Sequence, residues 1–392
     1  MNKVGTLIAI FILSLIFLSG CWDRKELNDR AIWAATGWDI EKKDRLLASG
    51  QIVIPSNMQP QGGGSAGNPY FIVSASGKNV EDSLQNLQAK LSRQSFMGQR
   101  RVTFFGEEFA KGGIKKYFEP IIRSSEVNIR TGAFVVKQGT ANEVLNLTYP
   151  LEKVPSLTAL REYEQISKNG DDTFLSFLID ANSDGIRPVL PAVETGKFLD
   201  GKQDSPANAS IKIAGLAMFD KKLKLIGFLN LKESRIVYWI KGSLKNHIVS
   251  ISLKEGNASL KLEKMNSKII PEINNKNQLK ITVKLTGNGA LIENNTKLDL
   301  LKLKNVKYME KDMEQYVREE VKKTIAKVKT KYGADIFGFG EAVHRKYPQQ
   351  WKKIKKDWDE KFAEVDVSVK VDLTIKRVGL SGPSLLFKES ER

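Results

Sequence analysis

The feature that most limits how this chain can fold is an apolar segment at its N-terminus. The segment runs unbroken from Leu7 to Leu13, and after Ser14 it continues to Leu18. One cation, Lys3, precedes it. A membrane-spanning helix needs roughly 20 apolar residues, whereas a shorter run that ends in small residues is typical of a secretory signal. The sequence therefore predicts that the remaining chain is exported and folds outside the cytoplasm.

The four residues from Leu18 to Cys21 resemble a bacterial lipobox. The small side chains of Ser19 and Gly20 let the chain enter a peptidase cleft, and the Cys21 thiol is nucleophilic enough to take a thioether-linked diacylglycerol. We predict that residues 1–20 are a signal peptide that is removed, and that Cys21 carries S-diacylglycerol and an N-acyl chain. One acyl chain holds a protein only marginally, so the several chains of a lipoprotein should anchor this one stably on the extracytoplasmic face of a membrane.

The composition excludes several kinds of catalytic chemistry. Cys21 is the only cysteine, so no intramolecular disulfide can form and no thiol remains for catalysis. The two histidines, His247 and His344, lie far apart in the sequence, so a histidine-rich metal site is not expected. No G-x-S-x-G nucleophile elbow, with its serine between a strand and a helix, is predicted, and the stretch "GFGEAVH" from Gly338 lacks the third glycine of a dinucleotide-binding loop. We predict a protein that is not an enzyme and has no catalytic residue, metal or cofactor.

The chain is strongly basic, with a formal net charge of +17 and a pI near 9.6. A basic balance can indicate nucleic-acid binding, but an exported protein rarely meets nucleic acid. The sequence also has no zinc-ligand spacing, RNP-like strand or helix-turn-helix pattern. We therefore expect no nucleic-acid partner, and anionic phospholipid head groups close to the anchor are the nearer counter-charge.

The first half of the chain alternates strand-like and helix-like segments. Residues 31–40 and 46–54 have the pattern of a β-hairpin around the polar turn "EKKDR". The alternation continues with strands expected at 70–75, 102–105 and 133–136, and with helices expected at 79–91, 107–118 and 140–147. Such an alternation favours a sheet covered by helices, so residues 21–149 are predicted to be an N-terminal α/β domain.

The middle of the chain has a less regular pattern. Residues 150–200 contain one expected helix, followed by the helix-breaking Pro188 and Pro191, and are predicted to form a small subdomain. Residues 201–210 are polar, with small side chains and Pro206, and are predicted to be an interdomain linker.

The last part, residues 211–392, is predicted to be a C-terminal α+β domain. It begins with strand-like runs at 211–219, 223–231 and 236–240, and further strand-like runs follow at 247–253, 259–262 and 279–285. Apolar residues then recur at helical spacing from Met309 to Tyr332, and shorter helices are expected at 335–346 and 348–362. Six apolar residues in strict alternation from Val365 to Ile375 predict a long closing strand with one buried face. The fold class expected for the whole chain is α+β, multidomain, with mixed or antiparallel sheets covered by helices.

Residues 337–358 combine aromatic and basic side chains. Helical spacing explains the tryptophans, so core packing is predicted for Phe337, Phe339, His344, Trp351 and Trp358. Four lysines share the same helix and are a candidate surface for anionic lipid or an acidic partner; they are Lys352, Lys353, Lys355 and Lys356. A solvated face without a binding role is the alternative.

Three stretches resemble the C-subunit, Ger(x)C-type family of spore germination lipoproteins. They are "GCWDRKELNDRAIWAATGWDI" from Gly20, "GLAMFDKKLKLIGFLNLKES" from Gly215 and "DIFGFGEAVHRKYPQQWKKIKKDW" from Asp335. The resemblance implies a lipid-anchored subunit that assembles with two integral membrane subunits, A and B, in the inner membrane of a dormant spore. There the complex responds to nutrients and triggers germination.

Two functions therefore stay open from the sequence. The resemblance favours a non-enzymatic scaffold or signalling subunit of a germinant receptor. The alternative is an extracytoplasmic solute-binding lipoprotein that captures a small nutrient itself, which would need a deep cleft. Whether a germinant touches this chain directly is not decided by any motif.

Overall fold

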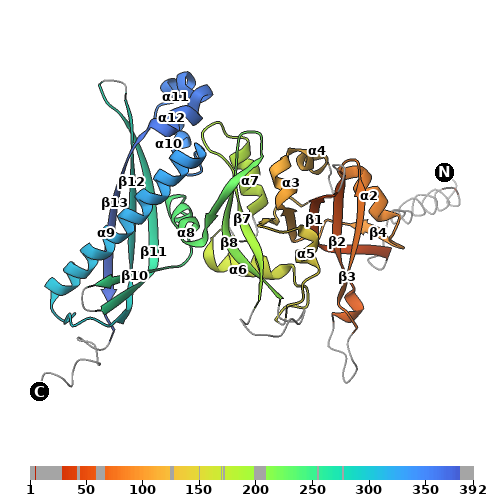
Figure 1. Cartoon of the computed structure of the whole chain (residues 1–392), viewed down its shortest axis with the longest axis horizontal. Coiled ribbons are helices and arrows are strands. Elements are labelled where there is room, and N and C mark those ends of the chain that lie inside the picture. The colour runs from red at the N-terminus through yellow and green to blue at the C-terminus, as the bar shows by residue number, and fades with distance from the viewer. Residues whose placement is uncertain are drawn as a thin grey trace, which may run out of the picture.

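The structure is a computed structural model. It describes residue 5 and residues 29–41, 45–58, 67–123, 128–149, 151–168, 170, 173–197, 209–253, 256–275 and 278–379. Cys21, the signal peptide and most of the expected linker 201–210 lie outside these residues. The molecule is elongated, with β4 and α2 at one end of its long axis and β10 and the start of α9 at the other (Figure 1).

A large mixed sheet forms the first part of the molecule. Its strand order is β3-β2-β1-β5-β6-β7-β8-β9, and β4 pairs separately with β1. The strands are β1 (Arg30–Ile40), β2 (Leu46–Val53), β3 (Tyr70–Gly77), β4 (Gln94–Phe96), β5 (Val102–Gly106), β6 (Gly132–Val136), β7 (Val189–Lys197), β8 (Ala209–Phe219) and β9 (Leu225–Asn230). β1, β5, β6 and β7 are parallel neighbours, and the other pairings along the sheet order are antiparallel. The predicted hairpin of residues 31–40 and 46–54 is confirmed as β1 and β2.

Helices cover both faces of this sheet. One face packs against α2 (Val80–Gln88), α3 (Glu107–Gly112), α4 (Lys115–Arg123) and α7 (Thr173–Ala181). The other face packs against α5 (Ala141–Leu145), α6 (Leu157–Ile166) and α8 (Leu231–Ile240). The short strands β5 and β6 are buried on both faces, which is why their sequences do not alternate between apolar and polar residues.

A second sheet of four strands has the order β10-β11-β12-β13. Its strands are β10 (His247–Leu253), β11 (Gly256–Ile273), β12 (Leu279–Asn294) and β13 (Asp366–Arg377). The long helix α9 (Leu303–Lys327) lies across this sheet (Figure 1). The core between them is continuous with the core under α8, so one apolar cluster joins the two sheets.

The outer edge of β13 is partly covered by carboxylates of α9. Glu314 accepts a hydrogen bond from the Leu373 backbone N–H at 2.9 Å, and the buried Glu310 accepts one from the Ile375 N–H at 2.8 Å. An edge strand with free N–H groups invites pairing with another chain, and these two contacts remove part of that edge.

Short helical segments follow α9. They are the π-helical turn η5 (Val328–Tyr332), α10 (Phe339–Lys346), α11 (Pro348–Ile354), the 3-10 turn η6 (Lys355–Asp357) and α12 (Trp358–Glu364). The helix predicted over residues 348–362 is therefore interrupted at η6, and the one predicted from residue 335 begins at Phe339.

One predicted element is wrong. Residues 236–240 were expected to be a strand and instead end helix α8. The helix is fixed by a capping box, in which Asn230 accepts from the Glu233 N–H at 2.9 Å and Glu233 accepts from the Asn230 N–H at 2.9 Å. The apolar run is then buried on all sides, so its sequence lacks a helical period.

The predicted fold class is confirmed, because mixed sheets are covered by helices and the long helix α9 is followed at the end by strand β13. The pairing of β7 with β8 runs across the boundary predicted at residue 211. Residues 150–200 also supply α6, α7 and β7 to the large sheet and its covering helices. The division into separate domains remains a prediction.

Candidate functional site

The motif-rich segment from residue 335 is organised around one carboxylate, that of Asp335. Its Oδ1 accepts hydrogen bonds from the N–H groups of Phe337, Gly338 and Phe339, at 3.0, 2.9 and 3.2 Å. Its Oδ2 accepts from the Gly340 N–H at 2.8 Å and from Trp358 Nε1 at 3.0 Å. Asp335 is fully buried, and burial raises its pKa to about 6 although these five donors favour the charged form. The carboxylate thus holds the start of α10 and the start of α12 together.

Four of the predicted packing residues lie in the core around this carboxylate. Phe337, Phe339, Trp351 and Trp358 are buried, and the two tryptophan rings meet edge to face at 5.3 Å. His344 differs, because its side chain is exposed and its ring stacks on Trp351 at 5.7 Å.

The Asp335 segment docks onto the loop of residues 183–187, which leads into β7. The buried Arg187 pairs with Asp359 at 2.8 Å, and its backbone N–H donates to the Asp335 carbonyl at 2.6 Å. Gly185 lies so close to α10 that an added Cβ would be 2.6 Å from the Glu341 nitrogen. This junction therefore locks the helices α10 to α12 onto the large sheet.

The four predicted surface lysines lie on α11 and η6, in the part of the molecule that holds the second sheet and away from β4 (Figure 1). Lys352, Lys353 and Lys356 are exposed, whereas Lys355 is half-buried and pairs with Asp184 at 3.2 Å. Lys353 also lines a cleft of about 810 Å³ between α11 and the β11–β12 hairpin. The lysines are brought together, but one of them serves the junction.

The N-terminal motif residues Trp38 and Asp39 are structural. The Trp38 ring is buried against Tyr117 at 5.2 Å. The Asp39 carboxylate accepts from the N–H groups of Ala141 and Asn142, at 2.8 and 2.9 Å, and so caps α5. Burial raises the pKa of Asp39 despite these donors.

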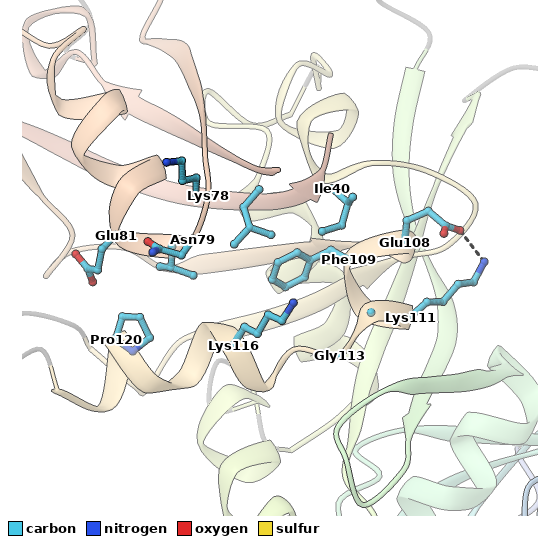
Figure 2. A pocket seen from close by; sticks show the side chains of 13 residues that line it. Ile40, Lys78, Asn79, Glu81, Glu108, Phe109, Lys111, Gly113, Lys116 and Pro120 are labelled. Carbon is cyan, nitrogen blue, oxygen red and sulfur yellow. Dashed lines mark hydrogen bonds and ion pairs between the residues drawn. The ribbon is translucent and has the colours of Figure 1, made fainter. Parts of the chain in front are cut away.

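A larger cleft opens at the carboxyl end of β1, between α2 and the pair α3 and α4 (Figure 2). Its volume is about 900 Å³. Apolar side chains contribute to its lining, and charged ones stand around them; the apolar ones are Ile40, Leu46, Val80 and Phe109, and the charged ones include Lys78, Glu81, Glu108, Lys111 and Lys116. Lys111 is held by Glu107 and Glu108, each at 2.8 Å. The volume of the cleft falls within the range of small-molecule sites, and sequence reasoning missed the cleft because its residues come from four separate segments.

The part of the chain that the structure describes contains no cluster of three histidine, cysteine or carboxylate side chains suited to a metal ion. Within the same residues, no helix combines the length and apolar character needed to cross a bilayer. His247 is half-buried near Arg235, and its partial burial lowers its pKa to about 4.

Comparison with known proteins decides the family. Residues 23–195 match the family described as "Spore germination protein N-terminal domain", and residues 214–379 match "Spore germination B3/ GerAC like, C-terminal". The chain belongs to the GerAC-like family of spore germination proteins. The two matches include most of the GerAC-like chain and both motif-rich ends of the folded part.

Relatives of this GerAC-like chain match over nearly their full length. Spore germination protein KC of Bacillus subtilis (strain 168) is 28% identical over 395 residues, which cover 95% of this chain and 96% of that protein. Spore germination protein B3 of the same organism is 22% identical over 388 residues, covering 97% and 100%. The crystal structure of the GerBC protein aligns with a TM-score of 0.56 at 17% identity, covering 87% of this chain and 96% of that chain. The GerBC likeness shows a shared fold.

Proposed function

We propose that this protein is the non-enzymatic, lipid-anchored C subunit of a nutrient germinant receptor that spores need for germination. Membership of the GerAC-like family carries the proposal. The lipobox that ends in Cys21 supports the anchor, and the resemblance of the motifs supports assembly with the integral membrane subunits A and B. Its place is then the extracytoplasmic face of the spore inner membrane.

The geometry supports an interaction role over catalysis. Four residues of the motifs are buried, and they serve core packing, helix capping or the junction with the loop 183–187. They are Trp38, Asp39, Asp335 and Trp358. A fold whose motif residues are buried in this way presents a rigid, elongated surface to a partner.

The anchor is tested with Cys21→Ala. We expect the variant to lose the label from radioactive palmitate, to leave the membrane fraction and to give defective germination. A variant that stays on the membrane without label and germinates normally would refute the anchoring part of the proposal.

Assembly is tested separately by co-purification from spore membranes. A tagged, lipidated chain should co-purify with the A and B subunits. If the chain is recovered at normal abundance without either subunit, the receptor role fails even where the anchor is intact.

Capture of a small nutrient is the second candidate, and the cleft of about 900 Å³ beside α2 favours it. Isothermal titration of the mature chain with candidate germinants tests it. Tight binding that Phe109→Ala abolishes would support capture of a nutrient by this chain. If no germinant in the series binds, the receptor subunit has no direct ligand among them.

A further inference from the structure

Three lysines stand side by side on the second sheet. Lys268 of β11 lies directly opposite Lys284 of β12, and Lys284 lies directly opposite Lys370 of β13. We call this set the lysine row, and all three of its side chains are exposed. Residues in direct register project from the same face, and adjacent strands lie about 4.8 Å apart. Three ammonium groups therefore share one strip of surface.

The lysine row lies on the face of the sheet that turns away from α9. The chain neighbours of the second and third lysines point the opposite way, into the core that α9 also joins; they are Val283, Leu285, Val369 and Val371. The pairing is regular through this part of the sheet, because the register shifts of β11, β12 and β13 all lie elsewhere. The three lysines are thus held together by the strand register and not by a mobile loop.

The charges of the lysine row are not neutralised by partner side chains. In the part of the chain that the structure describes, no ion pair joins any of the three lysines to a carboxylate. On this face of the three strands, the nearest carboxylate in register is that of Asp372, two residues after Lys370. It lines a small cleft together with Lys307 of α9. The row therefore keeps an excess of positive charge.

A second row on the same strands has the opposite arrangement. Lys280 stands between Glu272 and Asp366, and its amine pairs with Asp366 at 3.5 Å. Opposite charges across strands stabilise a sheet, whereas like charges directly opposite each other destabilise it. The sheet can thus hold a charge-matched row, and at Lys284 it holds an unfavourable one. Binding sites are a place where proteins retain such unfavourable arrangements, because a ligand relieves them.

The chemistry of the row defines its ligand. Each ammonium group offers three donors and no acceptor, so the ligand must supply negatively charged acceptors. The hydroxyl groups of Thr282 and Ser368, in the next row, are joined by a hydrogen bond at 2.9 Å. That bond uses one of the two hydroxyl protons and leaves the other for a ligand acceptor.

The architecture of this face favours a compact oxyanion over a polymer. The main-chain groups of β12 pair with β11 and β13, so an acidic peptide would gain no main-chain hydrogen bonds here. The strands β11, β12 and β13, all of which the structure describes, contain no aromatic side chain on which nucleic-acid bases could stack. Lysine binds phosphate well as a point charge, and a row about 10 Å long suits several linked phosphates.

We propose that the lysine row is a binding site for the phosphate groups of a polyvalent ligand. The site goes beyond the receptor role and does not depend on it, because its residues belong to the second sheet alone. The middle lysine, Lys284, has a charged neighbour on both sides and is the position at which the proposal is tested.

The test uses isothermal titration of the mature chain, with Cys21→Ala so that no lipid is attached. The probe is sodium tripolyphosphate, and citrate at matched ionic strength is the reference anion. Tripolyphosphate should bind more tightly than citrate, and binding should weaken with salt because the site is exposed. Lys284→Gln should weaken binding by at least about tenfold, the loss expected for a hydrogen bond between charged groups.

The matched control is Lys261→Gln. Lys261 is exposed on β11 and lies opposite Ile248 and Ala290, so it has no lysine beside it. This variant loses the same charge and should bind tripolyphosphate within about twofold of the parent chain. Circular dichroism melts establish that both variants fold.

Lys284→Glu gives a second, independent measurement. It places a carboxylate between two lysines, so without ligand its melting temperature should exceed that of the parent chain by about 2–4 °C. Tripolyphosphate should raise the melting temperature of the parent chain, since a ligand that binds the folded state stabilises it. It should not raise that of Lys284→Glu.

Vesicles distinguish two sources of phosphate. Co-sedimentation is measured with phosphatidylglycerol in phosphatidylcholine and with phosphatidylcholine alone. Binding of tripolyphosphate without binding of vesicles assigns the site to a soluble ligand, and vesicle binding that Lys284→Gln removes assigns it to lipid head groups. The proposal is overturned if neither probe binds, if citrate binds as tightly as tripolyphosphate, or if Lys284→Gln and Lys261→Gln behave alike. None of these results depends on germination or on acylation of Cys21.

Discussion

The carboxylate of Asp335 shows how one residue can hold three segments. It accepts four backbone N–H groups before and within the first turn of α10 and one indole N–H from α12. Its own carbonyl receives the N–H of Arg187 from the large sheet. A helix could not start at residue 335 while this side chain turns the backbone around itself, which explains why α10 starts four residues later than the helical pattern indicates.

Asp335→Asn should destabilise the protein. The amide nitrogen would replace one oxygen and face N–H donors from Gly340 and Trp358, and each unsatisfied buried donor costs about 1–3 kcal/mol. Urea unfolding at pH 7 should show a free energy of unfolding lower by at least about 2 kcal/mol. An unchanged midpoint would mean that the five hydrogen bonds are not formed in solution.

The same residue predicts a pH dependence. Burial raises the pKa of Asp335 from 3.8 to about 6, so the folded chain takes up a proton on acidification through this range before the unfolded chain does. The contribution of Asp335 to the free energy of unfolding therefore grows as the pH falls from about 6 to about 4, and it is lost as the pH rises through about 6. The stability gap between the parent chain and Asp335→Asn should widen between pH 7 and pH 5. A gap that narrows on acidification would contradict the raised pKa.

Trp358→Ala removes a fully buried ring together with its hydrogen bond to Asp335. A loss of about 3–5 kcal/mol is expected, with lower abundance of the protein in spores. Lys356→Ala, on the exposed side of the same segment, is the control and should change stability by less than about 0.5 kcal/mol. Similar stability in both variants would place Trp358 outside the core.

Among the elements, the junction between the loop 183–187 and α10 depends on close backbone approach. An added Cβ at Gly185 would meet the backbone of Gly340 and Glu341 at 2.6–2.7 Å, and backbone atoms cannot move aside cheaply. Gly185→Ala should lower the melting temperature, with a cost of about 1–3 kcal/mol. Gly112→Ala is the control, because no atom lies within 4 Å of its added Cβ. Equal melting of the two variants would show that the junction is looser than described.

Helices and strands could be predicted from the sequence where one face of the element is buried, because the buried residues then recur at the period of that element. The helix α9 and the closing strand β13 follow from their apolar spacing, since each buries one side against the small sheet. Strands β11 and β12 extend well beyond their predicted ends, because their outer halves carry lysines and asparagines whose strand conformation depends on pairing with each other. The break at η6 was not predictable, since Asp335 and Asp184 fix that segment from elsewhere in the chain.

The sites divide in the same way. The aromatic residues near the C-terminus could be assigned to the core from spacing alone, and the lipidation motif is local in sequence. The cleft beside α2 could not be predicted, because strand order decides which distant residues line it. Ile40 and Phe109, for example, line the cleft together because β1 pairs with β5, which leads directly into α3.

At the scale of the whole molecule, the proposed anchor on Cys21 predicts an orientation on the membrane, because β1 begins nine residues after Cys21. Cys21 is the only cysteine and would be blocked by lipid, so a single introduced cysteine can be labelled selectively. A fluorophore at Ser92→Cys, beside Arg93, should be quenched by a head-group quencher in anionic vesicles. One at Gln349→Cys on α11 should not be quenched. Equal quenching at both positions would indicate that the long axis lies flat on the bilayer.

The apolar cluster that passes under α8 has a mechanical consequence. Because the two sheets share one core, we expect the part of the molecule that begins with β1 and the part that carries α11 to move as a single rigid body. A tilt of a few degrees where the chain meets the lipid would sweep α11 through a much longer arc. A neighbouring subunit bound at one end would therefore be displaced when the other end is moved. The size of that displacement would depend on the distance of each end from the pivot.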